Sequence, residues 1–175
     1  MPLVPANDFI SWKERQISKG GDHQSLDHLI DSVGGCTKEK YHLIKLSLKK
    51  NIELKVNLEK LESLWNQHLN MGIPVQYLSG ISYWRDLKLE VSENVLIPRS
   101  ETELIIEIVQ ESFKQKFKEI TFVDLGTGSG AIGIALALAK PFWNGIATDI
   151  DKNAIQIASK NFARCSDKSL SLIHI

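Results

Sequence analysis

Residues 120–131 decide the fold, and they read Ile120-Thr121-Phe122-Val123-Asp124-Leu125-Gly126-Thr127-Gly128-Ser129-Gly130-Ala131. The first half of this stretch has the short, apolar and β-branched character of a buried strand. Glycines at alternate positions then predict a tight loop, and Ala131–Lys140 predicts a helix that Pro141 ends. Such a loop turns the free N–H groups of a helix start toward an anionic or polar ligand. The stretch therefore predicts a ligand-binding α/β domain.

The sequence beyond this stretch continues the alternation of strands and helices. Gly145–Asp149 predicts a second strand, and Asp151 can cap a helix that follows it. The inner face of that helix is expected to carry Ala154, Ile155, Ala158 and Phe162. Leu170–Ile175 then predicts the beginning of a third strand. This alternation indicates a parallel sheet, which needs both faces covered, so we expect a truncated or frameshifted form of a larger domain.

The residues before position 72 predict a small helical bundle. One amphipathic helix carries its apolar face on Leu26, Leu29, Ile30 and Val33, and Gly34-Gly35 should end it. Thr37 and Asn57 stand where side chains can cap two further helices. We assign residues 1–72 to a helical substrate-recognition domain.

A β-hairpin linker is predicted between the two domains, over residues 73–98. Leu87–Val91 alternates apolar and charged residues, Ser92–Asn94 can turn the chain, and Val95–Ile97 can return as the second strand. Ser100 and Glu103 have the spacing of a capping box, which predicts that a helix begins at Ser100. Residues 99–175 are assigned to a partial cofactor-binding domain.

The amino-acid composition limits the kinds of partner that we expect for this protein. Across 175 residues, 21 Lys and Arg balance 21 Asp and Glu, and this zero net charge argues against bulk electrostatic binding of nucleic acid. No apolar run approaches the ~20 residues that span a bilayer. The cysteines Cys36 and Cys165 form no motif, and no cluster has metal-ligand spacing. We expect a cytoplasmic monomer without a metal, a direct nucleic-acid partner or a membrane partner.

Two acidic residues narrow the choice of ligand. The glycine loop alone also fits the dinucleotide pattern G-x-G-x-x-G/A. Asp149, at the end of the second strand, can accept the ribose hydroxyls of any adenosine ligand, so NAD and S-adenosylmethionine both remain possible. Asp124 suits the ammonium of a methionine group better than a pyrophosphate. In the alternative interpretations, Asp124 caps the loop, Asp149 caps the next helix, and the glycines only make a turn.

Three segments of the chain resemble known sequence motifs. Phe122-Val123-Asp124-Leu125-Gly126-Thr127-Gly128-Ser129-Gly130 is similar to the first motif of class I methyltransferases. Pro74-Val75-Gln76-Tyr77-Leu78-Ser79-Gly80 and Val95-Leu96-Ile97-Pro98-Arg99-Ser100-Glu101-Thr102-Glu103 resemble the linker of the HemK/PrmC family. Members of that family methylate the side-chain amide of a glutamine in peptide chain release factors. Ser100 departs from the proline that is usual there.

The resemblance implies a fold and a set of cofactor contacts. The fold is α/β: a small N-terminal helical bundle, a β-hairpin linker and the first part of a Rossmann-like class I methyltransferase domain. The implied cofactor is S-adenosylmethionine, and the implied contacts are Asp124, Gly126, Thr127, Gly128, Ser129, Gly130 and Asp149. Pro98–Thr102 lies beside the cofactor in the family. A peptide chain release factor is the implied protein partner.

The motif that holds the substrate in that family is absent. No Asn-Pro-Pro-Tyr occurs in the 175 residues, so no catalytic residue is assigned. We therefore expect little or no transferase activity from this chain alone. The alternatives are a non-catalytic remnant that binds release factors, an NAD-dependent oxidoreductase, and a nucleic-acid adenine methyltransferase. The neutral charge and the helical front domain argue against the last of these.

Overall fold

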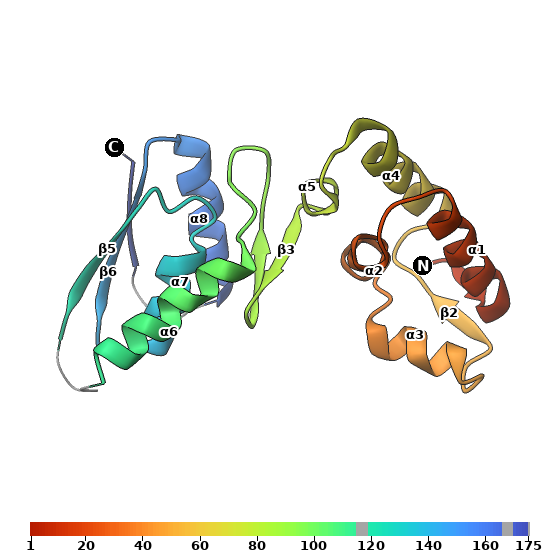
Figure 1. Cartoon of the computed structure of the whole chain (residues 1–175), viewed down its shortest axis with the longest axis horizontal. Helices are drawn as coiled ribbons and strands as arrows, with labels where there is room; N and C mark the ends of the chain where they lie inside the picture. The colour runs from red at the N-terminus through yellow and green to blue at the C-terminus, as the bar shows by residue number, and fades with distance from the viewer. Residues whose placement is uncertain (115–118, 166–169, 175) are drawn as a thin grey trace. The chain divides into compact units, whose positions relative to one another are not determined.

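The computed structural model describes residues 1–114, 119–165 and 170–174 (Figure 1), the last of these by backbone alone. The chain forms two compact units, Met1–Ser79 and Gly80–Ile175. The hairpin thus groups with the α/β part of the chain. The assignment of residues 73–98 as a linker between functional domains stays a proposal.

The front unit is mainly helical, as the apolar periodicity predicts. Its helices are α1 (Ala6–Ser18), α2 (His23–Ser32), α3 (Lys38–Lys45), α4 (Leu58–Met71) and α5 (Val75–Ser79). A short antiparallel pair, β1 (Leu3–Pro5) with β2 (Asn51–Glu53), departs from the purely helical prediction. Burial of Ile52 and the bond from Leu54 N to Pro2 O, at 3.0 Å, explain why this segment extends instead of coiling.

Local signals place the helix ends of the front unit. The side chain of Thr37 accepts from Lys40 N at 3.3 Å, and that of Asn57 accepts from Lys60 N at 3.0 Å, so both predicted caps are confirmed. The helix α2 ends at Ser32, just before the glycine pair. The core that these helices enclose includes Phe9, Trp12, Leu26, Leu29, Ile30, Leu54, Leu61 and Trp65.

The hairpin of the second unit is not the predicted one. Its strands are β3 (Ile81–Trp84) and β4 (Leu87–Glu90), joined by a two-residue turn in which Arg85 has a φ of 51°. The predicted pairing of Leu87–Val91 with Val95–Ile97 is therefore wrong, because β4 pairs with the segment before it. Burial of Trp84 in the core of this unit favours the observed partner.

The predicted capping box does not form either. A 3₁₀ turn, η1 (Ser100–Thr102), precedes α6 (Glu103–Ser112), and no side chain caps either element. The Ser100 hydroxyl donates instead to the carboxylate of Glu101, at 3.3 Å. Because the tight first turn bonds Thr102 N to Arg99 O at 3.1 Å, the chain enters the helix without needing the box.

The rest of the second unit is a parallel sheet, which confirms the predicted α/β class. The strands β5 (Thr121–Leu125), β6 (Asn144–Asp149) and β7 (Leu170–His174) lie in the order β5-β6-β7. The helices α7 (Ala131–Ala139) and α8 (Lys152–Cys165) follow β5 and β6 and lie on one side of the sheet (Figure 1). In the described part, β5 is an edge strand. Ile175, the last residue of the predicted third strand, lies outside the described residues.

Candidate cofactor site

The predicted glycine loop connects β5 to α7, and its backbone needs glycine. Gly126, Gly128 and Gly130 have φ values of 70°, 56° and 83°, in the left-handed region that other residues rarely adopt. A Cβ added at Gly126 or Gly128 would have no described neighbour within 4 Å. The loop therefore presents bare backbone toward open space, where a ligand can approach it closely.

The opposite side of the loop is packed tightly. A Cβ at Gly130 would lie 3.1 Å from Cδ1 of Ile134 and 3.2 Å from Cβ of Ala158. The third glycine thus allows α8 to approach the start of α7. This close approach gives the loop a rigid inner side and an open outer side.

Asp124 fixes the loop to the first turn of α7. Its Oδ2 accepts from the Thr127 hydroxyl at 2.7 Å and from Gly133 N at 3.1 Å. Asp124 therefore does cap the glycine loop, as one alternative interpretation of the sequence held. Oδ1 of Asp124 makes no hydrogen bond within the described residues, so one carboxylate oxygen can still accept from a ligand.

Asp149 fixes the same loop from the end of β6. Its Oδ2 accepts from Gly128 N at 2.9 Å, and its Oδ1 accepts from Asp151 N at 2.9 Å. Asp151 in turn accepts from Asn153 N at 2.7 Å, which supports its predicted role at the start of α8. Since a carboxylate offers about four lone-pair sites, Asp149 can still accept hydroxyl groups.

The side chains of Thr127 and Ser129 point into the protein. They are 8% and 3% exposed, and Thr127 N donates to Thr148 O at 2.9 Å. Thr127 O also accepts from Gly130 N at 2.9 Å, and Ser129 O accepts from Asn161 at 2.8 Å, so the predicted cofactor contacts of these two residues stay a proposal. The structure brings all the predicted cofactor residues together at the carboxyl ends of β5 and β6.

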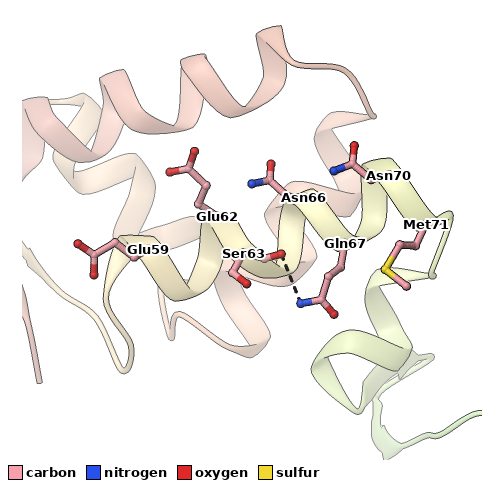
Figure 2. Close-up of a pocket in the computed structure, with 7 residues that line it drawn as sticks. All are labelled: Glu59, Glu62, Ser63, Asn66, Gln67, Asn70 and Met71. Carbon is pink, nitrogen blue, oxygen red and sulfur yellow. Dashed lines mark hydrogen bonds between the residues drawn. The ribbon is translucent and has the colours of Figure 1, made fainter.

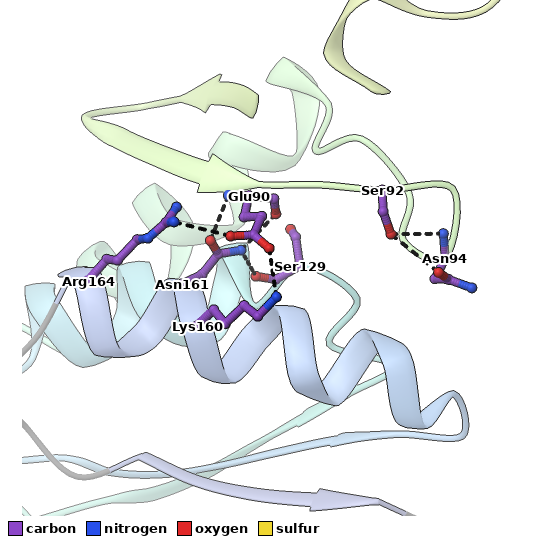
Figure 3. A network of polar contacts seen from close by, with 7 residues as sticks. All are labelled: Glu90, Ser92, Asn94, Ser129, Lys160, Asn161 and Arg164. Carbon is purple, nitrogen blue, oxygen red and sulfur yellow. Dashed lines mark hydrogen bonds and ion pairs between the residues drawn. The ribbon is translucent and has the colours of Figure 1, made fainter. Parts of the chain in front are cut away.

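The sequence interpretation missed two residues near this site. Ile150, directly after Asp149, is 82% exposed and places an apolar side chain at the carboxyl edge of the sheet. Its signal was an apolar residue following the strand-end acid. Asn161 is fully buried in α8 and bonds to both Ser129 and Glu90 (Figure 3). A single Asn inside a helix gives no sequence signal for such a role.

The arrangement is suited to binding a polar ligand. Backbone groups of the loop, two carboxylates and one exposed apolar side chain meet at one edge of the sheet. Among the described residues, no group of His, Cys, Asp or Glu could hold a metal ion. Within the same residues, no helix is long and apolar enough to cross a membrane.

The sequence is similar to known methyltransferases. Residues 100–173 match the family described as ribosomal protein L11 methyltransferase (PrmA). The release factor glutamine methyltransferase of Prochlorococcus marinus is 35% identical over 171 residues, which are 97% of this chain and 58% of that protein. The enzyme of the same name from Synechocystis is 41% identical over 166 residues, 91% of this chain and 55% of its own length.

The alignments cover only part of the length of these relatives. The chain spans about half the length of the curated relatives it matches, at 58%, 53% and 45% for three of them. A solved coclaurine N-methyltransferase aligns with 97% of this chain and 49% of its own, at 12% identity and a TM-score of 0.40. A structural likeness that slight adds nothing to the sequence match.

Proposed function

We propose that this chain, which belongs to the release factor glutamine methyltransferase family, forms the S-adenosylmethionine-binding part of an enzyme that methylates a glutamine side-chain amide in peptide chain release factors. The observation that carries the proposal is the alignment of 97% of the chain, at 35% identity, with such an enzyme. The open glycine loop between two acidic strand ends supports the same ligand.

Each part of the proposed cofactor has a matching group in the site. The loop backbone and the start of α7 suit the carboxylate of the methionine group. Oδ1 of Asp124 suits its ammonium, Asp149 suits the ribose hydroxyls, and Ile150 suits the face of the adenine. When bound, S-adenosylmethionine would supply the methyl group on its sulfonium sulfur. NAD fits less well, because its pyrophosphate would face Asp124.

The front unit is proposed to recognise the protein substrate. A shallow, open surface lies along α4, whose lining side chains are drawn in Figure 2. Its lining residues are Glu59, Glu62, Ser63, Asn66, Gln67, Asn70 and Met71. The amides among them can pair with the backbone of a protein partner. This face of α4 is the surface where we propose contact with a release factor.

The test uses the 175-residue chain and two readouts. In calorimetric titrations, S-adenosylmethionine and S-adenosylhomocysteine should bind and NAD should not. Asp149→Asn should weaken binding about tenfold, since it removes a charged acceptor. Asp151→Asn is the matched control, because Asn caps a helix as well as Asp does and should leave the affinity unchanged.

The second readout is methyl transfer to a purified release factor. Little or none is expected, because the chain contains no Asn-Pro-Pro-Tyr to hold the amide. Stoichiometric methylation by this chain would contradict that expectation. Binding of NAD without any response to S-adenosylmethionine would overturn the methyltransferase proposal, and capture of a release factor without cofactor binding would favour a non-catalytic binding module.

A further inference from the structure

The buried amide of Asn161 joins three parts of the second unit (Figure 3). Asn161 is 0% exposed, and its Nδ2 donates to Glu90 O at 2.9 Å and to Ser129 O at 2.8 Å. Its Oδ1 accepts from Glu90 N at 2.6 Å. A side-chain amide has two N–H donors, so both are used. One helix side chain therefore holds β4 and the glycine loop at the same time.

The bond to Ser129 controls the geometry of the loop. Ser129 lies between Gly128 and Gly130, neither of which has a side chain to anchor the backbone. Because the peptide group is planar, holding the Ser129 carbonyl also sets the direction of Gly130 N, which donates to Thr127 O at 2.9 Å. The amide of Asn161 thus fixes the peptide between Ser129 and Gly130.

The bonds to Glu90 connect the loop to the hairpin. Asn161 satisfies both backbone groups of Glu90, as a neighbouring strand would. The Glu90 carboxylate also pairs with Lys160 at 3.0 Å and with Arg164 at 3.2 Å. These two cations are 61% and 55% exposed, so solvent weakens their contribution. The buried amide is therefore the stronger link between β4 and α8.

We propose that Asn161 is a positioning residue for the cofactor loop, holding the Ser129 peptide in its binding geometry and coupling it to the hairpin strand β4. It acts through the backbone and touches no ligand. The part of this inference that concerns the ligand rests on the proposed function. The part that concerns loop geometry stands on the hydrogen bonds alone.

Asn161→Asp is the variant that separates positioning from packing. It keeps the shape of the side chain but replaces two donors with an acceptor that faces the carbonyls of Glu90 and Ser129. Burial raises the pKa of such a carboxyl, and its protonated form regains one donor. The defect should therefore be larger at pH 7 than at pH 5. Phe162→Leu, at the next buried position of α8, is the control for a packing change.

The first readout is hydrogen exchange at the amides of Gly126–Gly130 in the ligand-free chain, relative to the unsubstituted protein at each pH. Asn161→Asp should speed exchange about tenfold or more at pH 7, and the ratio should fall at pH 5 but stay above one, because only one of the two donors returns. Phe162→Leu should stay within about twofold at these amides. The second readout is S-adenosylhomocysteine affinity, with an expected loss of about tenfold for Asn161→Asp alone.

Equal loop exchange in the two variants, or an effect of Asn161→Asp that does not depend on pH, would overturn the proposal. If the unsubstituted chain binds no S-adenosylhomocysteine, the cofactor assignment fails, while the exchange comparison still decides the positioning role. If Asn161→Asp does not fold at pH 7, Asn161→Ser replaces it. Its short hydroxyl cannot reach both carbonyls, so the same gain in loop exchange is expected.

Discussion

The two units of this chain bury their apolar residues in different ways. In the front unit, Phe9, Leu29 and Trp65 are all 0% exposed, within a core enclosed by the helices of that unit. In the second unit, Val123 and Leu125 on the edge strand β5 are 53% and 75% exposed. The first unit completes its own core, whereas the second covers one face of its sheet.

This difference concerns the sheet of the second unit, whose edge strand β5 exposes apolar side chains. Parallel sheets are normally covered by helices on both faces, and contiguous exposed apolar surface marks a place of contact. On α6, Leu104, Ile105 and Ile108 are also 57%, 43% and 54% exposed. We expect the front unit to be the more stable of the two, since the free energy of burial is realised within it.

The sharpest test of the comparison makes the same substitution in both units. Leu61→Ala, at a position that is 0% exposed, should lower the unfolding free energy of the front unit by about 2–5 kcal/mol. Leu125→Ala, at a position that is 75% exposed, should change that of the second unit by no more than about 0.5 kcal/mol. Urea titration read by hydrogen exchange in each unit measures both values. A large loss for Leu125→Ala would mean that β5 is covered.

The reactivity of the two cysteines, one in each unit, tests how well each unit buries its side chains. Burial raises the pKa of the Cys36 thiol, in the front unit, from 9.0 to about 11, and also raises the pKa of Cys165, in the second. At pH 8 the shift alone reduces the Cys36 thiolate about 100-fold, so alkylation of Cys36 should be slower than that of the half-buried Cys165. Mass spectrometry after iodoacetamide treatment measures both rates.

The pH dependence of Cys36 has a definite sign. Because its folded pKa lies above the unfolded one, its contribution to stability is intact below about pH 9 and is lost as the pH rises toward 11. Cys36→Ala should remove this part of the pH dependence. If Cys36 were alkylated as fast as Cys165 under native conditions, the front unit would open easily. That result would contradict the expectation that the front unit is the more stable of the two.

Elements with strong local signals could be predicted from the sequence. The caps Thr37 and Asn57 act on N–H groups three residues away, and the loop after β5 follows from its own glycines. The hairpin could not be predicted in the same way. Alternation in Leu87–Glu90 says that a strand forms, but not whether it pairs forward or backward. Burial of Trp84 decides this, and burial is a property of the folded unit.

The residues of the candidate site also differ in whether the sequence alone could predict them. Asp124 and Asp149 could be found because each ends a predicted strand beside the loop. Their bonds to the loop itself were weighed only as an alternative for Asp124. Asn161 could not be found, because its partners Ser129 and Glu90 lie 32 and 71 residues away in the sequence. The burial of Thr127 and Ser129 likewise could not be read from the sequence, because it depends on how the loop packs in the folded unit.

The smallest expected effect compares a helix cap that forms with one that does not. Asn57→Ala removes the acceptor of Lys60 N at the start of α4 and should cost about 1 kcal/mol of front-unit stability. Ser100→Ala should cost no more than a few tenths of a kcal/mol, because the Ser100 side chain caps no helix and its hydroxyl donates to the exposed Glu101. Urea unfolding read by hydrogen exchange in each unit measures both. A loss near 1 kcal/mol for Ser100→Ala would mean that the Ser100 side chain does cap α6. The start of α6 would then be set by the local sequence and not by packing of the second unit.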